Sequence, residues 1–257
     1  LHLSIRRQRQ MCIRDSHHPD PTEDHNLVDL VKEIKSGEYD FGVAYDGDAD
    51  RVVAVDEKGR IIRSDILMAL FLPEVINNFG DSIVYDVKCS QALEDMIKRH
   101  NGNPMMWKTG HSLIKAKMAE LSAPLAGEMS GHIFFADEYY GFDDAIYAAL
   151  RLLRILARNE QKLGEIRDNL PNMFNTPELR FDCPDDRKSF VVDIVRDRLM
   201  TDGNYNVCDI DGVRVETKDG WWLLRASNTQ PVLVARCESA TETGLSRLKD
   251  ELLSHLC

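Results

Sequence analysis

Three aspartates at alternate positions, Asp46, Asp48 and Asp50, form the stretch of the chain best suited to chemistry. Two like charges about 4 Å apart near a protein surface repel by roughly 4 kcal/mol at an effective dielectric of about 20. Such a cluster is therefore favoured by a bound cation or by full exposure to water. Carboxylate oxygens are hard ligands, which favours Mg²⁺, with Mn²⁺ or Ca²⁺ as alternatives. Arg51 follows directly, and a guanidinium beside a metal suits a phosphoryl oxygen.

Three other interpretations of this acidic loop stay open on spacing alone. A solvated acidic turn is as compatible with the residues as a metal site. A calcium loop of the EF-hand type would use Glu57 at its twelfth position, but Arg51 stands at the sixth, where that loop needs glycine. A phosphatase loop of the Asp-x-Asp type is the third, although the threonine expected two residues after its nucleophile is missing.

Further polar loops follow strand-like runs, and ligands bind beyond the carboxyl ends of strands in open α/β sheets. One carries Lys88 at the end of a strand, and the segment 108–112 combines Lys108, a threonine, a glycine and His111. In the segment 127–132, Glu128 and Ser130 can exchange hydrogen bonds with sugar hydroxyls, and His132 follows them. Each loop alone is also compatible with an ordinary turn.

A last polar loop, 225–231, lies between two strands predicted near the carboxyl end. Its planar cation and small donors, with backbone amides in a nest, suit a phosphate monoester. A simple turn ended by Pro231 is the alternative. The candidate phosphate ligands are Arg225, Ser227, Asn228 and Thr229.

Alternating strands and helices must position these loops, which predicts an α/β architecture. Strands are expected at 41–45, 52–55, 83–87, 105–107, 124–126 and 133–135. Helices are expected from Asp24 or Asn26 to Gly37, from Ser64 or Asp65 to about Asn78, at 90–101 and at 111–121, and a long helix is expected to be capped by Asp143 or Asp144. Ile146, Leu150, Leu153 and Ala157 would form the buried face of the last of these helices.

The pattern changes after residues 169–177, which resemble a linker with two prolines. Helices at 186–200 and 241–256 then flank strands at 206–210, 213–216, 221–225 and 232–237. Helices beside an antiparallel meander predict a separate, small α+β domain.

Composition limits the classes of partner and compartment. The 257 residues are 43% hydrophobic, as in a soluble globular protein. A net charge of −11 argues against nucleic acid or an anionic membrane as a partner. Six cysteines without a Cys-x-x-Cys pair indicate a reducing, cytoplasmic environment.

The first sixteen residues look foreign to the rest. The run from Arg6 to Asp15 resembles the translated read-through of a common sequencing adapter, so we exclude residues 1–16 from fold reasoning. We therefore expect a carboxyl-terminal fragment of a longer protein.

Four motifs in order, 46–51, 108–112, 127–132 and 225–231, resemble those of the α-D-phosphohexomutases, most closely the bacterial phosphomannomutase/phosphoglucomutase branch. The resemblance implies the end of a second α/β domain at 17–62 and a third, mixed-sheet α/β domain at 63–171. The segment 172–257 would be a TATA-binding-protein-like α+β domain.

The resemblance implies an isomerase that moves a phosphoryl group reversibly between the 1- and 6-positions of mannose or glucose phosphates, through a phosphoserine and a hexose 1,6-bisphosphate. The implied metal ligands of Mg²⁺ are Asp46, Asp48 and Asp50. The implied catalytic residues are Arg51 and Lys88, whose positive charges would act on the transferred phosphoryl group, and His111 and His132, which would assist proton transfer. The implied substrate-binding residues are Lys108, Glu128, Ser130, Arg225, Ser227, Asn228 and Thr229.

The sequence departs from the family pattern at several places. Ala49 stands where the family often has glycine, which is tolerable if that position does not need a positive φ, and Gln230 replaces a more usual residue. The phosphoserine loop is expected in a first domain upstream, so this chain alone should not turn over. A non-catalytic module that binds sugar phosphates is the alternative function.

Overall fold

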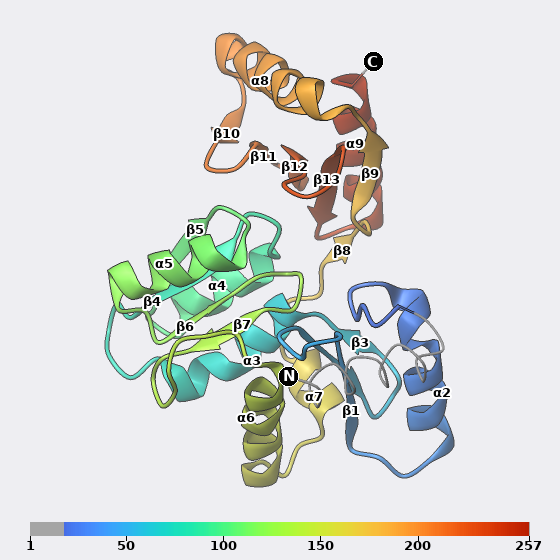
Figure 1. Cartoon of the computed structure of the whole chain (residues 1–257), viewed down its shortest axis with the longest axis vertical. Coiled ribbons are helices and arrows are strands. Elements are labelled where there is room, and N and C mark those ends of the chain that lie inside the picture. Colours follow the sequence, from blue (N-terminus) through green and yellow to red (C-terminus); the bar gives the residue numbers. More distant parts are fainter. Residues whose placement is uncertain (1–17, 257) are drawn as a thin grey trace, which may run out of the picture.

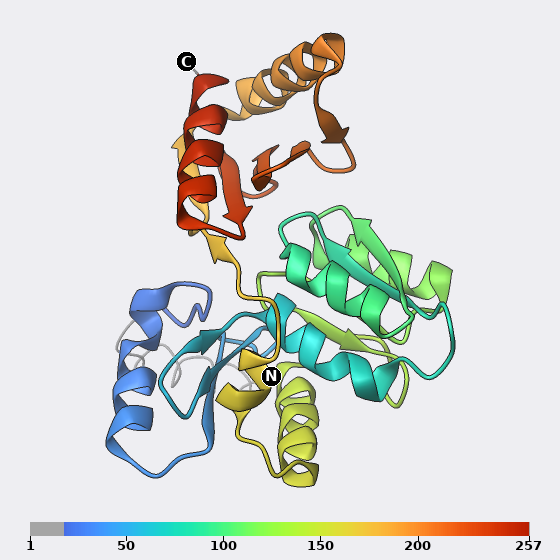
Figure 2. The same cartoon turned by 180° about the vertical axis from the view of Figure 1, so that it is seen from behind.

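The computed structural model describes residues 18–256, which fold around three β-sheets (Figures 1 and 2). The first part contains a 3₁₀ helix η1 (Asp24–Leu27), a helix α2 (Val28–Ser36) and an antiparallel sheet of order β1-β2-β3. The strands are β1 (Phe41–Tyr45), β2 (Val52–Asp56) and β3 (Ile61–Ile62). Neither Asp24 nor Asn26 caps this helical segment. Asp24 instead pairs with Arg63, and the Asn26 amide donates to the Asp20 carbonyl.

A four-stranded sheet of order β5-β4-β6-β7 forms the centre of the molecule. Strands β4, β5 and β6 are parallel, and β7 is antiparallel to β6, which makes the sheet mixed. The strands are β4 (Ser82–Asp86), β5 (Asn103–Trp107), β6 (Leu125–Gly127) and β7 (Ile133–Phe135). The helices around it are α3 (Ser64–Val75), α4 (Gln91–Arg99), α5 (His111–Leu121) and α6 (Ala145–Arg158).

Apolar side chains that point alternately to the two sides of each strand give this sheet a hydrophobic core on both faces. Ile83 and Tyr85 of β4 pack in the larger core with α3, α4 and α6, whereas Val84 packs against α5. The larger core also contains Val52 and Ile62 of the first sheet. The first two sheets therefore share one hydrophobic core, and the acidic loop between β1 and β2 is anchored against the central sheet.

Helix α3 begins at Ser64, one position earlier than a cap at Ser64 would require and two positions earlier than a cap at Asp65 would require. Its N-cap is Arg63, without a side-chain cap. The predicted caps were wrong because both side chains are used elsewhere: Ser64 donates to the Glu128 carbonyl at 2.6 Å, and Asp65 accepts from the Ser90 amide at 3.0 Å. Pro73 lies inside the last turn, and the helix ends at Val75 rather than Asn78.

The predicted buried face of α6 was also wrong. Ile146, Leu150 and Leu153 are about half exposed, whereas the buried side includes Leu152 and Arg151. Arg151 is buried because its guanidinium binds both carboxylate oxygens of Asp137 and lies over the Phe135 ring, 4.5 Å from the ring centroid. The buried face of α6 therefore includes an ion pair and differs from the stripe expected from hydrophobicity alone.

A short helix α7 (Leu163–Asp168) leads through residues 169–173 to the last domain, which stands apart from the rest in both views (Figures 1 and 2). The predicted linker contains a strand, β8 (Phe174–Asn175), that pairs with β13. The antiparallel sheet has the order β10-β11-β12-β13, with β8 and β9 both on β13. Its remaining elements are β9 (Leu179–Asp182), α8 (Asp185–Asp202), β10 (Asn206–Cys208), β11 (Val213–Thr217), β12 (Gly220–Ala226), β13 (Val232–Ser239) and α9 (Glu242–Ser254).

The two faces of this last sheet have different partners. Trp222 and Leu224 pack with helices α8 and α9, whereas Trp221 and Leu223 pack against Val87 of the central domain. The predicted order, α/β domains followed by a small α+β domain, is confirmed. Within residues 18–256, no helix combines the length and apolar character needed to cross a bilayer.

Candidate active site

The acidic loop folds around the carboxylate of its first aspartate. Asp46 Oδ1 accepts hydrogen bonds from the backbone amides of Asp50 and Arg51, both at 3.1 Å, and Oδ2 accepts from Arg51 Nε at 2.7 Å. This ring of donors brings the side chains of Asp46, Asp48 and Asp50 together, with one ligand atom of each within 4.8 Å of the others. The sequence prediction that the three carboxylates converge is therefore correct.

Ala49 adopts a left-handed conformation within this loop, with φ +60°. The condition under which alanine would be tolerated without strain, a φ that is not positive, is therefore not met. Its carbonyl accepts from the Ala145 amide at 3.0 Å, at the start of α6, which fixes the peptide orientation. An alanine there carries a conformational strain that glycine would not.

The far side of the acidic loop is joined to the segment 127–132 by backbone contact. The Val52 amide donates to the Gly131 carbonyl at 3.1 Å, and Arg51 forms a β-bridge with His132. Gly131 has φ +116°, and a Cβ on it would lie 2.8 Å from Arg51 Cβ. Glycine is required at this position both by its backbone conformation and by the close approach.

The charges of the trio are unequal. Burial raises the pKa of Asp50 to about 7, and the neighbouring carboxylates of Asp46, Asp48 and Asp143 act in the same direction. Burial acts on Asp46 too, but hydrogen bonds from Arg51 outweigh it and lower its pKa. Asp50 Oδ1 is buried without a hydrogen-bond partner. An orphaned carboxylate oxygen among converging hard ligands fits a divalent cation such as Mg²⁺.

The two candidate histidines share one carboxylate. Asp143 Oδ2 lies 3.0 Å from His132 Nδ1 and 3.5 Å from His111 Nδ1, and the two rings are stacked with centroids 5.4 Å apart. His132 Nδ1 is also 3.8 Å from Asp50 Oδ2, which places this histidine beside the trio. Burial lowers the pKa of His132, partly opposed by Asp143, so its neutral form is favoured. A neutral imidazole can accept a proton from a hydroxyl.

Glu128 organises the neighbouring loops and is almost fully buried. Its Oε1 accepts from the Gly110 amide, and its Oε2 accepts from Ser130 Oγ at 3.0 Å. Burial, reinforced by Asp86, raises the pKa of Glu128. Both oxygens are thus engaged within the protein, and Ser130 is the member of the pair that reaches the adjoining cavity.

The phosphate-binding candidate Arg225 contacts the segment 108–112 through an aspartate. Arg225 Nε donates to Asp211 Oδ2 at 3.0 Å, and the same oxygen accepts from the Thr109 amide at 2.9 Å. Asn228 donates to the Thr109 carbonyl at 3.2 Å. Ser227 Oγ accepts from the amides of the residues after Asn228. Thr229 and Lys108 have exposed side chains.

Lys88 lies at the wall of a large cavity between the three sheets. Its Nζ is 3.5 Å from Glu178 Oε2 and 3.8 Å from Asp86 Oδ2. The cavity has a volume of about 640 Å³, within the range of about 300–1,000 Å³ typical of ligand sites. Its polar lining includes Asp20, Arg51, Lys88, Ser130, Glu178 and Arg236. Neither the three aspartates nor Arg225 lines this cavity; the acidic loop borders it through Arg51.

Several residues of this site were missed by sequence reasoning. Asp143 was interpreted only as a possible helix cap, and the cap of α6 is its neighbour Asp144. Asp211 and Glu178 contact the candidate residues across domains, and no local spacing signals such pairs. Asp86, at the end of β4, was the detectable one, because it lies at a carboxyl strand end immediately before the Lys88 loop.

Comparison with known proteins gives consistent matches along the chain. The family models for phosphoglucomutase/phosphomannomutase match in three parts: alpha/beta/alpha domain II at residues 4–59, alpha/beta/alpha domain III at 63–174, and the C-terminal domain at 178–255. The three matches follow one another in the order of the numbered domains.

A phosphomannomutase/phosphoglucomutase from Pseudomonas putida is 46% identical over 242 residues, which cover 94% of this chain and 52% of the relative. A crystal structure of a phosphoglucomutase/phosphomannomutase family protein from Burkholderia thailandensis has a TM-score of 0.86 at 45% identity, covering 94% of this chain and 51% of that one. The chain spans about half the length of the relatives it matches.

A more distant fold relative is an N-acetylphosphoglucosamine mutase from Aspergillus fumigatus, solved with GlcNAc-6P and magnesium. It is 16% identical with a TM-score of 0.59, covering 83% of this chain and 51% of that one. At this identity the likeness concerns the fold.

Proposed function

Because the chain belongs to the phosphoglucomutase/phosphomannomutase family, we propose that it carries the magnesium site, the sugar-binding loops and the phosphate clamp of a cytoplasmic phosphohexomutase. The reaction is the reversible transfer of a phosphoryl group between the 1- and 6-positions of mannose or glucose phosphates. The phosphoserine that donates and receives this group is expected in a segment outside this chain. Turnover is therefore assigned to the longer protein.

Asp46, Asp48 and Asp50 would hold the Mg²⁺ ion. When bound, the cation neutralises charge on the phosphoryl group in transfer. Arg51, fixed by Asp46 and facing the cavity, adds a guanidinium for the phosphoryl oxygens. Lys88 contributes a second positive charge from the lining of the same cavity, where burial strengthens its field.

His132 is the better candidate for moving the proton of the attacking sugar hydroxyl. Its Nδ1 lies 3.0 Å from Asp143 Oδ2 without hydrogen-bond geometry. A proton on Nδ1, facing that carboxylate, would leave Nε2 as the atom able to accept the proton. His111 is more exposed and shares the same carboxylate, so it is suited to positioning the sugar. Asp143 would hold both rings and stabilise the imidazolium that forms.

The remaining candidates would bind the parts of the substrate that do not react. Ser130 Oγ, whose hydrogen is donated to Glu128, would accept a hydrogen bond from a sugar hydroxyl. Arg225, Ser227, Asn228 and Thr229 would bind the non-reacting phosphate, with Lys108 beside them. The domain that carries the phosphate ligands would close on the bound sugar.

One observation supports this proposal most strongly. Contacts between side chains and backbone form a continuous path from the phosphate candidate Arg225, through Thr109 and Glu128, to the loop that bears His132 next to Asp50. Three of the five loops contribute Arg51, Lys88 and Ser130 to one cavity. The other two loops, which carry Thr109 and Arg225, are joined to that group by the contacts of this path.

A coupled mutase assay on the full-length protein and on this chain tests the proposal. We expect the full-length protein to interconvert hexose 1- and 6-phosphates and to lose activity on removal of Mg²⁺, and this chain to be silent. Binding is tested on this chain by calorimetry with Mg²⁺ and glucose 1,6-bisphosphate. Asp48→Asn should weaken Mg²⁺ binding, and Asp29→Asn on the outer side of α2 is the control.

A non-catalytic module that binds sugar phosphates is the second candidate, favoured by the cavity alone. It predicts the same calorimetric binding with no exchange of phosphate position in the full-length protein. Exchange that persists without an upstream serine would contradict both candidates.

A further inference from the structure

The inner face of the last sheet carries charged side chains that are almost completely buried. Arg214, Arg236 and Glu238 are 1%, 4% and 0% exposed. Buried charge is costly unless each group finds charged or hydrogen-bonding partners. Trp221 of the same sheet donates to Glu238 at 3.0 Å. Other partners on this face lie in the loop of the central domain that carries Lys88.

Two arginines bind three successive carbonyls of that loop. Arg214 Nη1 donates to the Val87 carbonyl at 2.7 Å and to the Cys89 carbonyl at 3.1 Å. Arg236 Nη1 donates to the carbonyl of Lys88 itself. The Arg214 guanidinium also stacks on Trp221, with Cζ 3.8 Å from the ring centroid, which fixes its plane.

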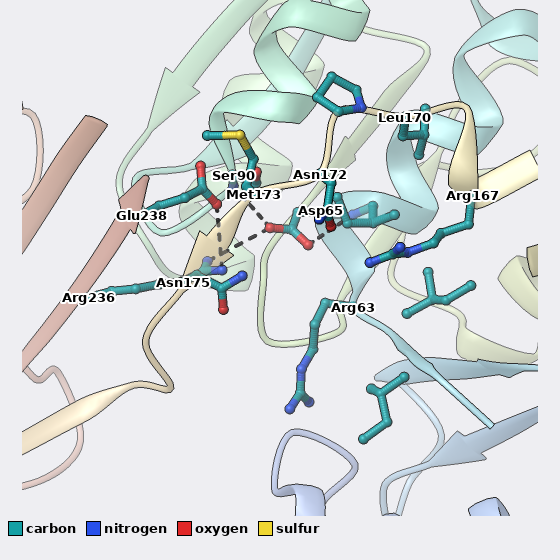
Figure 3. A pocket seen from close by; sticks show the side chains of 14 residues that line it. Arg63, Asp65, Ser90, Arg167, Leu170, Asn172, Met173, Asn175, Arg236 and Glu238 are labelled. Atoms are coloured by element: carbon teal, nitrogen blue, oxygen red, sulfur yellow. Dashed lines mark hydrogen bonds and ion pairs between the residues drawn. The ribbon is translucent and has the colours of Figure 1, made fainter. Parts of the chain in front are cut away.

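Two carboxylates bind the backbone amides that follow. Asp65 Oδ2 accepts from the Ser90 amide at 3.0 Å, and Glu238 Oε1 accepts from the Gln91 amide at 2.8 Å. Figure 3 shows Asp65, Glu238 and Arg236 converging beside Ser90, at the wall of a cavity of about 100 Å³ under the interdomain linker. The backbone of residues 87–91 is therefore held from both sides, largely by the last domain.

We infer that Arg214 and Arg236 are positioning residues for Lys88, so that docking of the last domain assembles the catalytic lysine as well as the phosphate clamp. The inference rests on the proposed role of Lys88. It follows from the contacts: separation of the last domain would remove the donors of three carbonyls in this loop, expose them to water, and also remove Glu178 from the Lys88 ammonium. Lys88 would then lose its fixed position over the cavity.

The test measures the order of this loop in the 257-residue chain without ligand. Arg214→Met and Arg236→Met keep the aliphatic stem and remove the donors, and Arg196→Met on α8 is the matched control, since its partners lie on its own helix. Two quantities are followed by mass spectrometry: hydrogen exchange of residues 87–91, and acylation of Lys88 relative to exposed Lys32. Exchange in β12 and β13 reports whether the last domain stays folded.

We expect each methionine variant to raise Lys88 acylation and loop exchange at least tenfold over Arg196→Met, with β12 and β13 still protected. Arg236→Lys, which keeps the charge but offers a single donor group, should give an intermediate rate. If the methionine variants do not fold, the same two measurements are made on Arg214→Lys and Arg236→Lys. An unchanged Lys88 acylation rate in folded variants would overturn the inference. Failure of the Mg²⁺ or sugar-phosphate titrations would leave this result unaffected, because no ligand is present here.

Discussion

Asp211 holds the guanidinium of Arg225, with Arg225 Nε 3.0 Å from Asp211 Oδ2 and Nη2 3.5 Å from Oδ1. The carboxylate thus occupies donors that the proposed function assigns to a phosphate. The same oxygen accepts from the Thr109 amide, so one acidic side chain joins the phosphate loop to the sugar-binding loop. An incoming phosphate must share Arg225 with this carboxylate or displace it.

Replacement of Asp211 by asparagine should therefore tighten phosphate binding. Asparagine keeps an oxygen for the Thr109 amide and removes the competing charge, which is worth about 1 kcal/mol for a partly exposed pair, or roughly fivefold in affinity. Calorimetric titration of this chain with inorganic phosphate measures the change. Asp209→Asn, on an exposed neighbour, is the control. Weaker binding in Asp211→Asn would mean instead that the carboxylate orients Arg225 for the anion.

The left-handed residue of the acidic loop predicts a stabilising substitution. Ala49→Gly should relieve a strain of about 1 kcal/mol and raise the melting temperature by about 3 °C. Thermal unfolding followed by circular dichroism measures this shift. Ala119→Gly, at an exposed position inside α5, should lower the melting temperature instead, because glycine there costs about 1 kcal/mol of stability. Equal destabilisation by both substitutions would contradict the assignment of strain to Ala49.

The raised pKa of Asp50 predicts how stability depends on pH. The folded chain holds this proton up to about pH 7, whereas an unperturbed aspartate has a pKa of 3.8. The contribution of Asp50 is therefore complete below about pH 4 and is lost as the pH rises through 7. Mg²⁺ competes with the same proton, so the cation should stabilise the chain more at pH 8 than at pH 5.

Melting temperatures of wild type and Asp50→Asn, with and without Mg²⁺, isolate this group from the other carboxylates. We expect the metal-free difference between them to grow between about pH 4 and 7 in favour of Asp50→Asn. We also expect Asp50→Asn to lose most of the stabilisation by Mg²⁺. Curves for the two proteins that run parallel across this interval would show that Asp50 titrates normally.

Two adjacent leucines of α6 test the buried face found in the structure. Leu152 is 2% exposed and Leu153 is 49% exposed. Leu152→Ala should lower the free energy of unfolding by about 3 kcal/mol, and Leu153→Ala by less than about 0.5 kcal/mol. Urea titration measures both. A larger loss for Leu153→Ala would restore the face first predicted from hydrophobicity.

Local signals in the sequence were enough to find most elements and the loops that bear the site. The Ser90 cap is confirmed, with its hydroxyl accepting from the Ala92 amide at 3.1 Å, because capping depends on residues two or three positions apart. The convergence of Asp46, Asp48 and Asp50 was equally local. The roles assigned to the site residues stay predictions.

What the sequence did not reveal depends on contacts between distant residues. Arg151 of α6 is buried by Asp137 and Phe135, and a pattern of hydrophobicity assigns arginine to the surface. Asp211 likewise became meaningful only when folding brought it between Arg225 and Thr109. Pairs of this kind carry no spacing rule, since their separation along the chain depends on how the domains dock.

The backbone joins on either side of the acidic loop have a mechanical consequence. The Ala49 carbonyl accepts a hydrogen bond from the first residue of α6, and the Val52 amide donates to the Gly131 carbonyl. The loop is therefore hydrogen-bonded to the central domain at two points. If α2 and the outer strand β1 rotated, the three aspartates would keep their position relative to the central sheet. A bound cation would then stay at the same distance from His132 during domain movement. The hinge for such movement would lie outside the loop.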